Sequence, residues 1–180
     1  MNQRLIYVIG PSGAGKDTIL NAVRHQLSAS SNIRWVVRTI TRPLMQVHGE
    51  LHESVSIDEF AKLSACGAFV FEWEANKLHY GIRREALSPL EQNNWVFLNG
   101  SRQYLPTAAK LYPGLTVVHI TAHHDIIKQR LISRDRESEA MIQERLNRLI
   151  APVIPPETQL IEVLNDTTVE AACHSLLVNL

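Results

Sequence analysis

Residues 10 to 18 read Gly10-Pro11-Ser12-Gly13-Ala14-Gly15-Lys16-Asp17-Thr18, and this stretch decides the fold. A short apolar run, Leu5 to Ile9, precedes it, and apolar residues at helical spacing follow it. A glycine-rich turn between a buried strand and a helix, with a lysine at its end, is typical of a phosphate-binding loop. Its backbone N–H groups converge on phosphate oxygens, and Lys16 places its ammonium on the β- and γ-phosphates. The pattern predicts that all nine residues bind ATP.

The residue after the lysine departs from the usual form of such loops. It is normally Ser or Thr, whose hydroxyl contacts Mg²⁺, but here it is Asp17, followed by Thr18. The apolar run 95–98 ends in Asn99, where an acidic residue often lies near the metal. Two interpretations stay open. Asp17 supplies the negative charge that Asn99 lacks and helps to hold Mg²⁺, or it merely caps the start of the helix.

Outward from the loop, strand and helix patterns alternate along the chain, which predicts an α/β fold with a parallel core sheet. The polar segment between Arg42 and Tyr80 interrupts the alternation, so we expect residues 36–82 to form an insertion on the substrate side. The expected strands are 5–9, 33–41, 69–73, 95–98, 115–120 and 159–164. The expected helices are 57–64 (with Ser56 as N-cap and Glu59 at its third position), 104–111, 125–134, 139–150 and 169–177.

Composition bounds the class of protein. The 180 residues suit one domain, and 18 basic residues balance 18 acidic ones, so a nucleic-acid or membrane-surface binder is not expected. Arginine outnumbers lysine by 13 to 5, which favours two-point contacts with phosphate or carboxylate. No stretch is long enough to cross a bilayer, and Cys66 and Cys173 lie far apart. We therefore expect a cytoplasmic protein with reduced thiols, and composition does not indicate its oligomeric state.

Several short segments besides the phosphate loop resemble those of guanylate kinases in order and spacing, and together they cover nearly the whole chain. They are Thr39-Ile40-Thr41-Arg42-Pro43, Gly49-Glu50, Glu72-Trp73, Tyr80-Gly81, Arg134, Arg145-Leu146 and Asn165-Asp166. The resemblance implies a P-loop NTPase fold with an acceptor-binding insertion and a lid over residues 130–148. Within this lid it assigns Arg134 and Arg145 to the transferring phosphoryl group, beside Lys16. The remaining lid arginines, Arg130, Arg136 and Arg148, fit a solvated, salt-bridged helix face.

Within that superfamily the closer likeness is to the kinases of the phosphonate pathway that phosphorylate ribose 1,5-bisphosphate. The segments that carry it are Gly15-Lys16-Asp17, Ile40-Thr41-Arg42, Glu50-Leu51-His52, Trp73-Glu74-Ala75-Asn76 and Asn99-Gly100-Ser101-Arg102. Two positions that help bind guanine in guanylate kinases are Arg38 and Ile82 here, and only Glu72 keeps the guanine-side pattern. An apolar Ile82 cannot pair with a base carbonyl, which costs about 1–3 kcal/mol in a buried pocket.

The resemblance therefore implies an acceptor without a base, a phosphorylated sugar that needs cations and polar groups. The substrate-binding candidates are Arg38, Arg42, His52, Glu72, Tyr80, Asn99 and Arg102. We expect ATP-dependent phosphorylation of ribose 1,5-bisphosphate to phosphoribosyl diphosphate, with Mg²⁺ as cofactor. Two alternatives stay open: a nucleoside-monophosphate kinase, supported by Glu72, and a non-catalytic guanylate-kinase-like module. The intact Lys16 loop and the lid arginines disfavour the module, because a scaffold needs neither.

Overall fold

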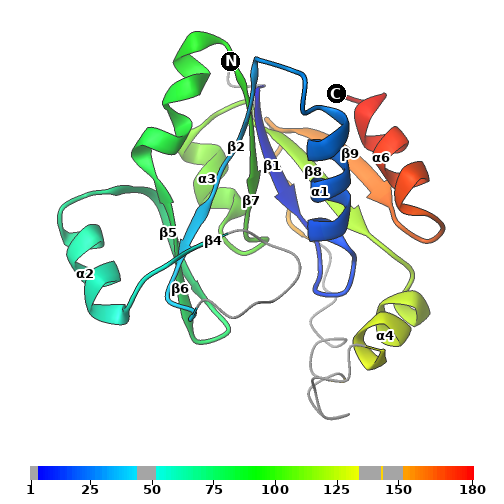
Figure 1. The fold of residues 1–180 in the computed structure, drawn as a ribbon, viewed down its shortest axis with the longest axis horizontal. Coiled ribbons are helices and arrows are strands. Elements are labelled where there is room, and N and C mark those ends of the chain that lie inside the picture. Colours follow the sequence, from blue (N-terminus) through cyan, green and yellow to red (C-terminus); the bar gives the residue numbers. More distant parts are fainter. Residues whose placement is uncertain (1–3, 44–51, 134–142, 144–151) are drawn as a thin grey trace.

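The computed structural model describes residues 4–43, 52–133, 143 and 152–180, and two sheets lie within them. The main sheet has five parallel strands in the order β2-β7-β1-β8-β9 (Figure 1). Their bounds are β1 (Leu5–Ile9), β2 (Ile33–Trp35), β7 (Trp95–Asn99), β8 (Thr116–Thr121) and β9 (Gln159–Leu164). The expected α/β fold with a parallel core sheet is confirmed.

Helices cover both faces of the main sheet. Helices α1 (Lys16–Gln26) and α6 (Val169–Leu177) pack on one face, against Ile6 and Val8 of β1. Helix α3 (Leu105–Leu111) packs on the other face, where Tyr7 belongs to the same cluster (Figure 1). Strand β1 is buried on both faces, which explains its continuous apolar run. Because β1 lies between β7 and β8, its carboxyl end delivers the glycine-rich loop to the middle of one sheet edge.

A smaller sheet of four strands, in the order β4-β3-β6-β5, lies beside the main one. Its strands are β3 (Arg38–Ile40), β4 (His52–Ser54), β5 (Phe69–Ala75) and β6 (Leu78–Arg83). Strands β3 and β4 run parallel, and the other two pairings are antiparallel. Helix α2 (Ile57–Ala65) covers one side of this sheet, where Phe60 stacks on Phe69 with ring centroids 4.6 Å apart. The expected Ser56–Glu59 capping box is present at its start.

Most expected elements are confirmed, but the region before residue 95 differs. The expected strand 33–41 is wrong as one element, because Val36 and Val37 cross between sheets and divide it into β2 and β3. Strands β4 and β6 and the 3₁₀ helix η1 (Arg84–Gln92) were not expected, since β4 is short and polar and β6 contains a glycine. Helix α4 (His124–Ile132) lies within the expected 125–134 region apart from its first residue. The expected helix 139–150 falls outside the described residues except for Gln143.

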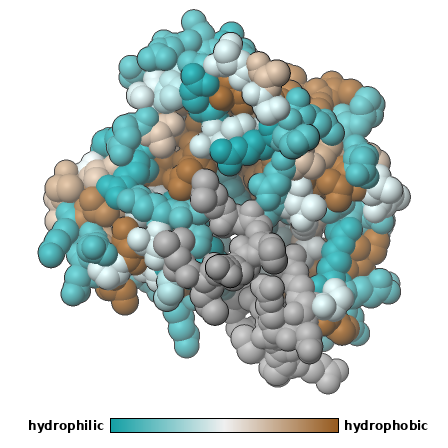
Figure 2. All heavy atoms as spheres, in the orientation of Figure 1, coloured by the Kyte–Doolittle hydropathy of each residue, from teal (hydrophilic) through white to brown (hydrophobic). Residues whose placement is uncertain are grey.

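Hydrophilic residues cover much of the face shown in Figure 2, and the apolar ones form separate patches. None of the helices in the described part of the chain is long and apolar enough to span a membrane. Both cysteines are free thiols, Cys66 exposed and Cys173 buried.

Candidate active site

The glycine-rich loop connects β1 to α1, and every residue predicted for it lies in this turn or the first turn of the helix. Gly15 is the N-cap of α1 and has a φ of 86°, a conformation that other residues adopt only with strain. The Lys16 ammonium donates to the carbonyls of Gly10 and Pro11, at 2.8 and 3.1 Å. The lysine therefore lies across the loop, where its charge faces any anion bound at the helix N-terminus.

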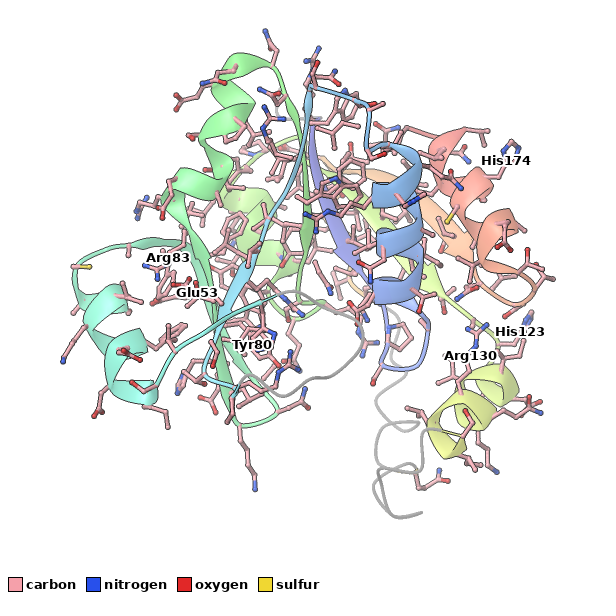
Figure 3. The ribbon with its side chains drawn as sticks, viewed as in Figure 1. Glu53, Tyr80, Arg83, His123, Arg130 and His174 are labelled. Atoms are coloured by element: carbon pink, nitrogen blue, oxygen red, sulfur yellow. The ribbon has the colours of Figure 1, made fainter. Side chains whose placement is uncertain are left out.

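The residues that follow β9, the edge strand of the main sheet, hold this loop in place. Asn165, which follows β9 and is 3% exposed, donates through Nδ2 to the Ala14 carbonyl at 2.8 Å. The next residue, Asp166, accepts from the backbone N–H of His123 at 2.7 Å and contacts that imidazole. Figure 3 shows His123 and Arg130 near helix α4. Sequence reasoning assigned no role to the Asn-Asp pair, although two polar residues directly after an apolar strand are a usable signal.

Asp17 and Asn99 meet at the carboxyl end of the main sheet. The Asn99 amide donates to Asp17 Oδ1 at 3.0 Å, which joins the end of β7 to the start of α1. Asn99 Oδ1 is buried and has no hydrogen-bond partner among the described residues. A carboxylate and an amide oxygen are hard oxygen ligands of the kind that Mg²⁺ prefers. These residues fit the expected metal.

The acceptor candidates Arg38 and Tyr80 lie on one side of the small sheet, which we call the inner face. Strand register and side-chain alternation place Arg38, His52, Trp73 and Tyr80 together on it, on the side of the buried Phe71 and Ile82. The Arg38 guanidinium lies 5.2 Å from the centroid of the Tyr80 ring. The Tyr80 and Trp73 rings are parallel within 3°, with centroids 5.4 Å apart. An arginine stacked in this way keeps its N–H donors at the edge of an aromatic platform.

Arg42 and His52 contact each other, since Arg42 Nη2 lies 3.3 Å from His52 Nδ1. The Arg42 carbonyl accepts from the Ser54 hydroxyl at 2.6 Å, which holds the chain after β3 against β4. His52 is also the register partner of Arg38. Three predicted acceptor residues from two strands and the following turn thus lie side by side.

Glu72 is placed differently from the other candidates. Its register partner is Gly81, whose own partner is Thr39, so its side chain points to the outer face of the small sheet. That face carries Glu53, which accepts from Thr39 at 2.6 Å and from Arg83 Nη2 at 2.7 Å (Figure 3). The structure therefore separates Glu72 from Arg38, His52 and Tyr80.

Arg102 lies in the loop after β7 and is half-buried, which lowers the pKa of its guanidinium, although arginine stays charged. His119 on β8 is a residue that sequence reasoning missed. Burial lowers the pKa of His119, and the charges of Arg102 and Lys16 lower it further, while Glu162 opposes them. His119 Nδ1 lies 3.8 Å from Glu162 Oε1. A histidine among the apolar residues of β8, a strand that pairs with the strand carrying the loop, was the available signal.

The predicted lid residues Arg134 and Arg145 lie outside the described residues. Arg130 is within them, and its expected place on a solvated helix face is wrong. Its side chain is half-buried, and its Nη1 atom is buried close to Gly15 of the loop.

A parallel sheet whose first strand leads through a glycine-rich loop and a lysine into a helix defines the P-loop proteins. The small sheet beside that loop adds a face that carries Arg38.

The chain belongs to the guanylate kinase family, whose model, described as guanylate kinase, matches residues 2–178. A relative from Thiobacillus denitrificans, named ribose 1,5-bisphosphate phosphokinase PhnN, is 38% identical over 174 residues, covering 97% of this chain and 90% of that protein. A Pseudomonas fluorescens protein of the same name is 46% identical over 148 residues, which cover 82% of this chain and 77% of that protein. The crystal structure of guanylate kinase from Anaplasma phagocytophilum has a TM-score of 0.69 at 16% identity, covering 97% of this chain and 83% of that one, which supports the fold alone.

Proposed function

We propose that this chain transfers the γ-phosphoryl group of ATP to the 1-phosphate of ribose 1,5-bisphosphate, giving 5-phosphoribosyl 1-diphosphate and ADP in phosphonate catabolism. In this reaction an acceptor phosphate oxygen bonds to the γ-phosphorus as the bond to the β–γ bridging oxygen breaks. The names of the relatives from Thiobacillus denitrificans and Pseudomonas fluorescens support this acceptor. We further propose a cytoplasmic enzyme, where ATP is plentiful.

The observation that carries the proposal is the chemistry of the inner face. Arg38 and Arg42 bring two guanidinium groups to one side of the small sheet, beside His52 and Tyr80. Ile82, on the same face, is fully buried in the core and offers no polar group to a base. Glu72, the residue that favours guanine, points to the other face. A face that offers guanidinium groups but no polar partners for a base suits an acceptor made of phosphates and hydroxyls.

On the donor side, the loop 10–15 binds the triphosphate of ATP. The Lys16 ammonium, which donates to two loop carbonyls, exchanges those contacts for phosphate oxygens. Asn165 keeps the loop in place through the Ala14 carbonyl during this exchange. Positioning and charge neutralisation then account for most of the rate enhancement, because phosphoryl transfer requires little covalent chemistry from the protein.

We propose that Asp17 holds Mg²⁺, with Asn99 fixing the orientation of its carboxylate. The 3.0 Å hydrogen bond from Asn99 supports this role, because it leaves the second carboxylate oxygen and the Asn99 carbonyl oxygen available to a cation or its water. When bound, the ion supplies charge neutralisation for the donor phosphates. Arg134 and Arg145 are proposed, from the family resemblance, to contribute positive charge from the lid.

The test measures products directly. The purified chain is incubated with ATP, Mg²⁺ and either ribose 1,5-bisphosphate or GMP, and ADP, phosphoribosyl diphosphate and GDP are quantified. We expect phosphoribosyl diphosphate to form in equal amounts with ADP, and GDP to form far more slowly. Faster turnover of GMP would identify a nucleoside-monophosphate kinase. Absence of ATP consumption with both acceptors, together with no ATP binding, would indicate the non-catalytic module.

A further inference from the structure

A tyrosine lies in the middle of the most buried strand of the molecule. Tyr7 belongs to β1, is 0% exposed, and packs with Phe71 on the side of helix α3. Its neighbours along the strand are aliphatic, and a phenylalanine ring would fill the same space. Since burying a hydroxyl is costly unless it is hydrogen-bonded, the role of Tyr7 depends on what its hydroxyl contacts.

Both hydrogen bonds of that hydroxyl go to one residue of the loop after β7. The Ser101 backbone N–H donates to the Tyr7 oxygen at 3.0 Å, and the Tyr7 hydroxyl donates to the Ser101 carbonyl at 3.2 Å. Burial raises the pKa of Tyr7, so the hydroxyl keeps the proton that it donates. The backbone of this loop is therefore fixed by a side chain of the strand that leads into the phosphate loop.

Gly100 allows this contact. A Cβ atom at this position would lie 2.2 Å from Cζ of the Tyr7 ring and 2.7 Å from its hydroxyl oxygen. The Gly100 N–H also donates to the Val8 carbonyl at 2.8 Å, so the pairing of β7 with β1 continues into the start of this loop. A glycine is needed here because the backbone touches the tyrosine.

The fixed loop carries site residues at both of its ends. Asn99 on one side of Gly100 bonds to Asp17, and Arg102 on the other side of Ser101 is a half-buried cation. The Tyr7 ring also packs edge-on against Phe71 of β5, with ring centroids 6.2 Å apart, which links it to the small sheet. The hydroxyl thus lies where the main sheet, the loop 99–102 and the inner face of the small sheet come together.

We propose that Tyr7 is a positioning residue, which holds the backbone of the loop 99–102 so that Arg102 binds an acceptor phosphate. Arg102 is the residue through which it acts on the acceptor, and this part of the inference rests on the proposed function. The hydroxyl itself does not touch the substrate. Its loss is expected to loosen the loop without opening the core, because the ring remains.

The test compares Tyr7→Phe with Tyr112→Phe. Tyr112 packs edge-on against the same Phe71 ring, so its substitution also removes a phenol hydroxyl from this cluster. We expect Tyr7→Phe to lower kcat/KM for the acceptor roughly tenfold, mainly through KM, because Ser101 loses two hydrogen bonds. The KM for ATP and all constants of Tyr112→Phe are expected to stay within about twofold of the wild-type values. An unchanged acceptor KM in Tyr7→Phe would overturn the proposal.

A double-mutant cycle with Arg102→Ala distinguishes positioning from a general loss of stability. If Tyr7 acts through Arg102, Tyr7→Phe is expected to change the acceptor kcat/KM by less than about twofold in the Arg102→Ala background. An equal effect in both backgrounds, or an equal rise in the KM for ATP, would show that the hydroxyl serves the fold and overturn the proposal. The cycle uses whichever acceptor the wild-type chain turns over. A chain active only on GMP thus contradicts the proposed function while the cycle still tests Tyr7.

Discussion

The phosphate loop and the inner face of the small sheet hold the two ends of the candidate active site in different ways. The loop consists of consecutive residues, and its shape follows from a buried strand, glycines and a helix start. The inner face is assembled from several strands, so Arg38, His52 and Tyr80 meet only because β4, β3 and β6 pair in one register. One region is encoded locally and the other by long-range pairing.

This difference indicates where the chain can change its specificity. A loop that binds phosphate through backbone N–H groups offers few side chains to exchange. The inner face presents side chains from separate strands, and each can be replaced without altering the main sheet. We therefore expect substitutions in the loop to abolish turnover and substitutions on the inner face to change the acceptor constants.

The largest effect is expected from Lys16→Met, which removes the ammonium and keeps an unbranched side chain. We expect kcat to fall by about 10³-fold with either acceptor, because a charge directed at the transferring group is lost. Lys110→Met on helix α3 is the matched control and is expected to be neutral. Steady-state ADP formation measures both. A fall in kcat of less than tenfold in Lys16→Met would contradict the role of the phosphate loop in binding the donor phosphates.

Arg38→Met is expected to have the next largest effect. The guanidinium over Tyr80 is lost while an apolar stem remains, so kcat/KM for the acceptor should fall about 10²-fold. The KM for ATP should stay within about twofold. Arg34→Met removes an exposed guanidinium that bonds to the Ser31 and Ile33 carbonyls, and it should leave both constants unchanged. Equal losses in the two variants would argue against a specific role for the inner face.

Asp17→Asn tests the two interpretations of this residue. If Asp17 serves the metal, the Mg²⁺ concentration for half-maximal rate should rise about tenfold, since a carboxylate ligand becomes a neutral amide. Asp58→Asn, in the first turn of α2, is the control for a charge that only interacts with a helix dipole. Because Gly15 is the N-cap of α1, the alternative to a metal role is that Asp17 only interacts with the helix dipole from the first turn. In that case both variants should show a lower melting temperature, and the Mg²⁺ dependence should not change.

The smallest effect is expected from Glu53, on the outer face. Burial alone would raise the pKa of this carboxyl, but hydrogen bonds from Arg83 and Thr39 outweigh it and hold the pKa below its usual value. A carboxyl whose pKa is lowered in the folded state stabilises the protein at pH values above its pKa in the unfolded chain, near 4.5. This stabilisation is lost as the pH falls through the pKa of the folded state.

Glu53→Gln should therefore lower the melting temperature at pH 7 by only a few degrees, since a partly exposed pair contributes less than about 1 kcal/mol. The difference between wild type and variant should narrow as the pH falls below about 4.5, as measured by thermal unfolding across pH. A difference that widens in acid would show that the assigned direction is wrong. Acceptor constants at pH 7 should not change.

The locally encoded parts of the molecule could be predicted from the sequence. Spacings of a few residues predict the phosphate loop and the Ser56 capping box. The alternation of strand and helix patterns predicts that the main sheet is parallel. The division of 33–41 between two sheets could not be predicted, because Val36 and Val37 are as strand-like as their neighbours. Propensity describes a strand but not the sheet that it joins.

The same limit applies within the site. Arg38, Arg42 and His52 could be proposed as acceptor residues from a resemblance in sequence, and the structure brings them together. The side of the sheet to which Glu72 points depends on its register with Gly81, and a sequence does not fix a register. Tyr7 and His119 were missed because a buried strand position is ordinarily structural, and only the contacts of their polar atoms distinguish them.

One competition experiment tests the central claim most directly. Ribose 1,5-bisphosphate and GMP are supplied at equal concentrations with limiting ATP and Mg²⁺, and phosphoribosyl diphosphate and GDP are quantified from the same reaction. Their ratio at early times equals the ratio of the two kcat/KM values. We predict at least about 100-fold more phosphoribosyl diphosphate, since unpaired base groups and lost charged contacts together exceed 2.7 kcal/mol. An excess of GDP would contradict the account.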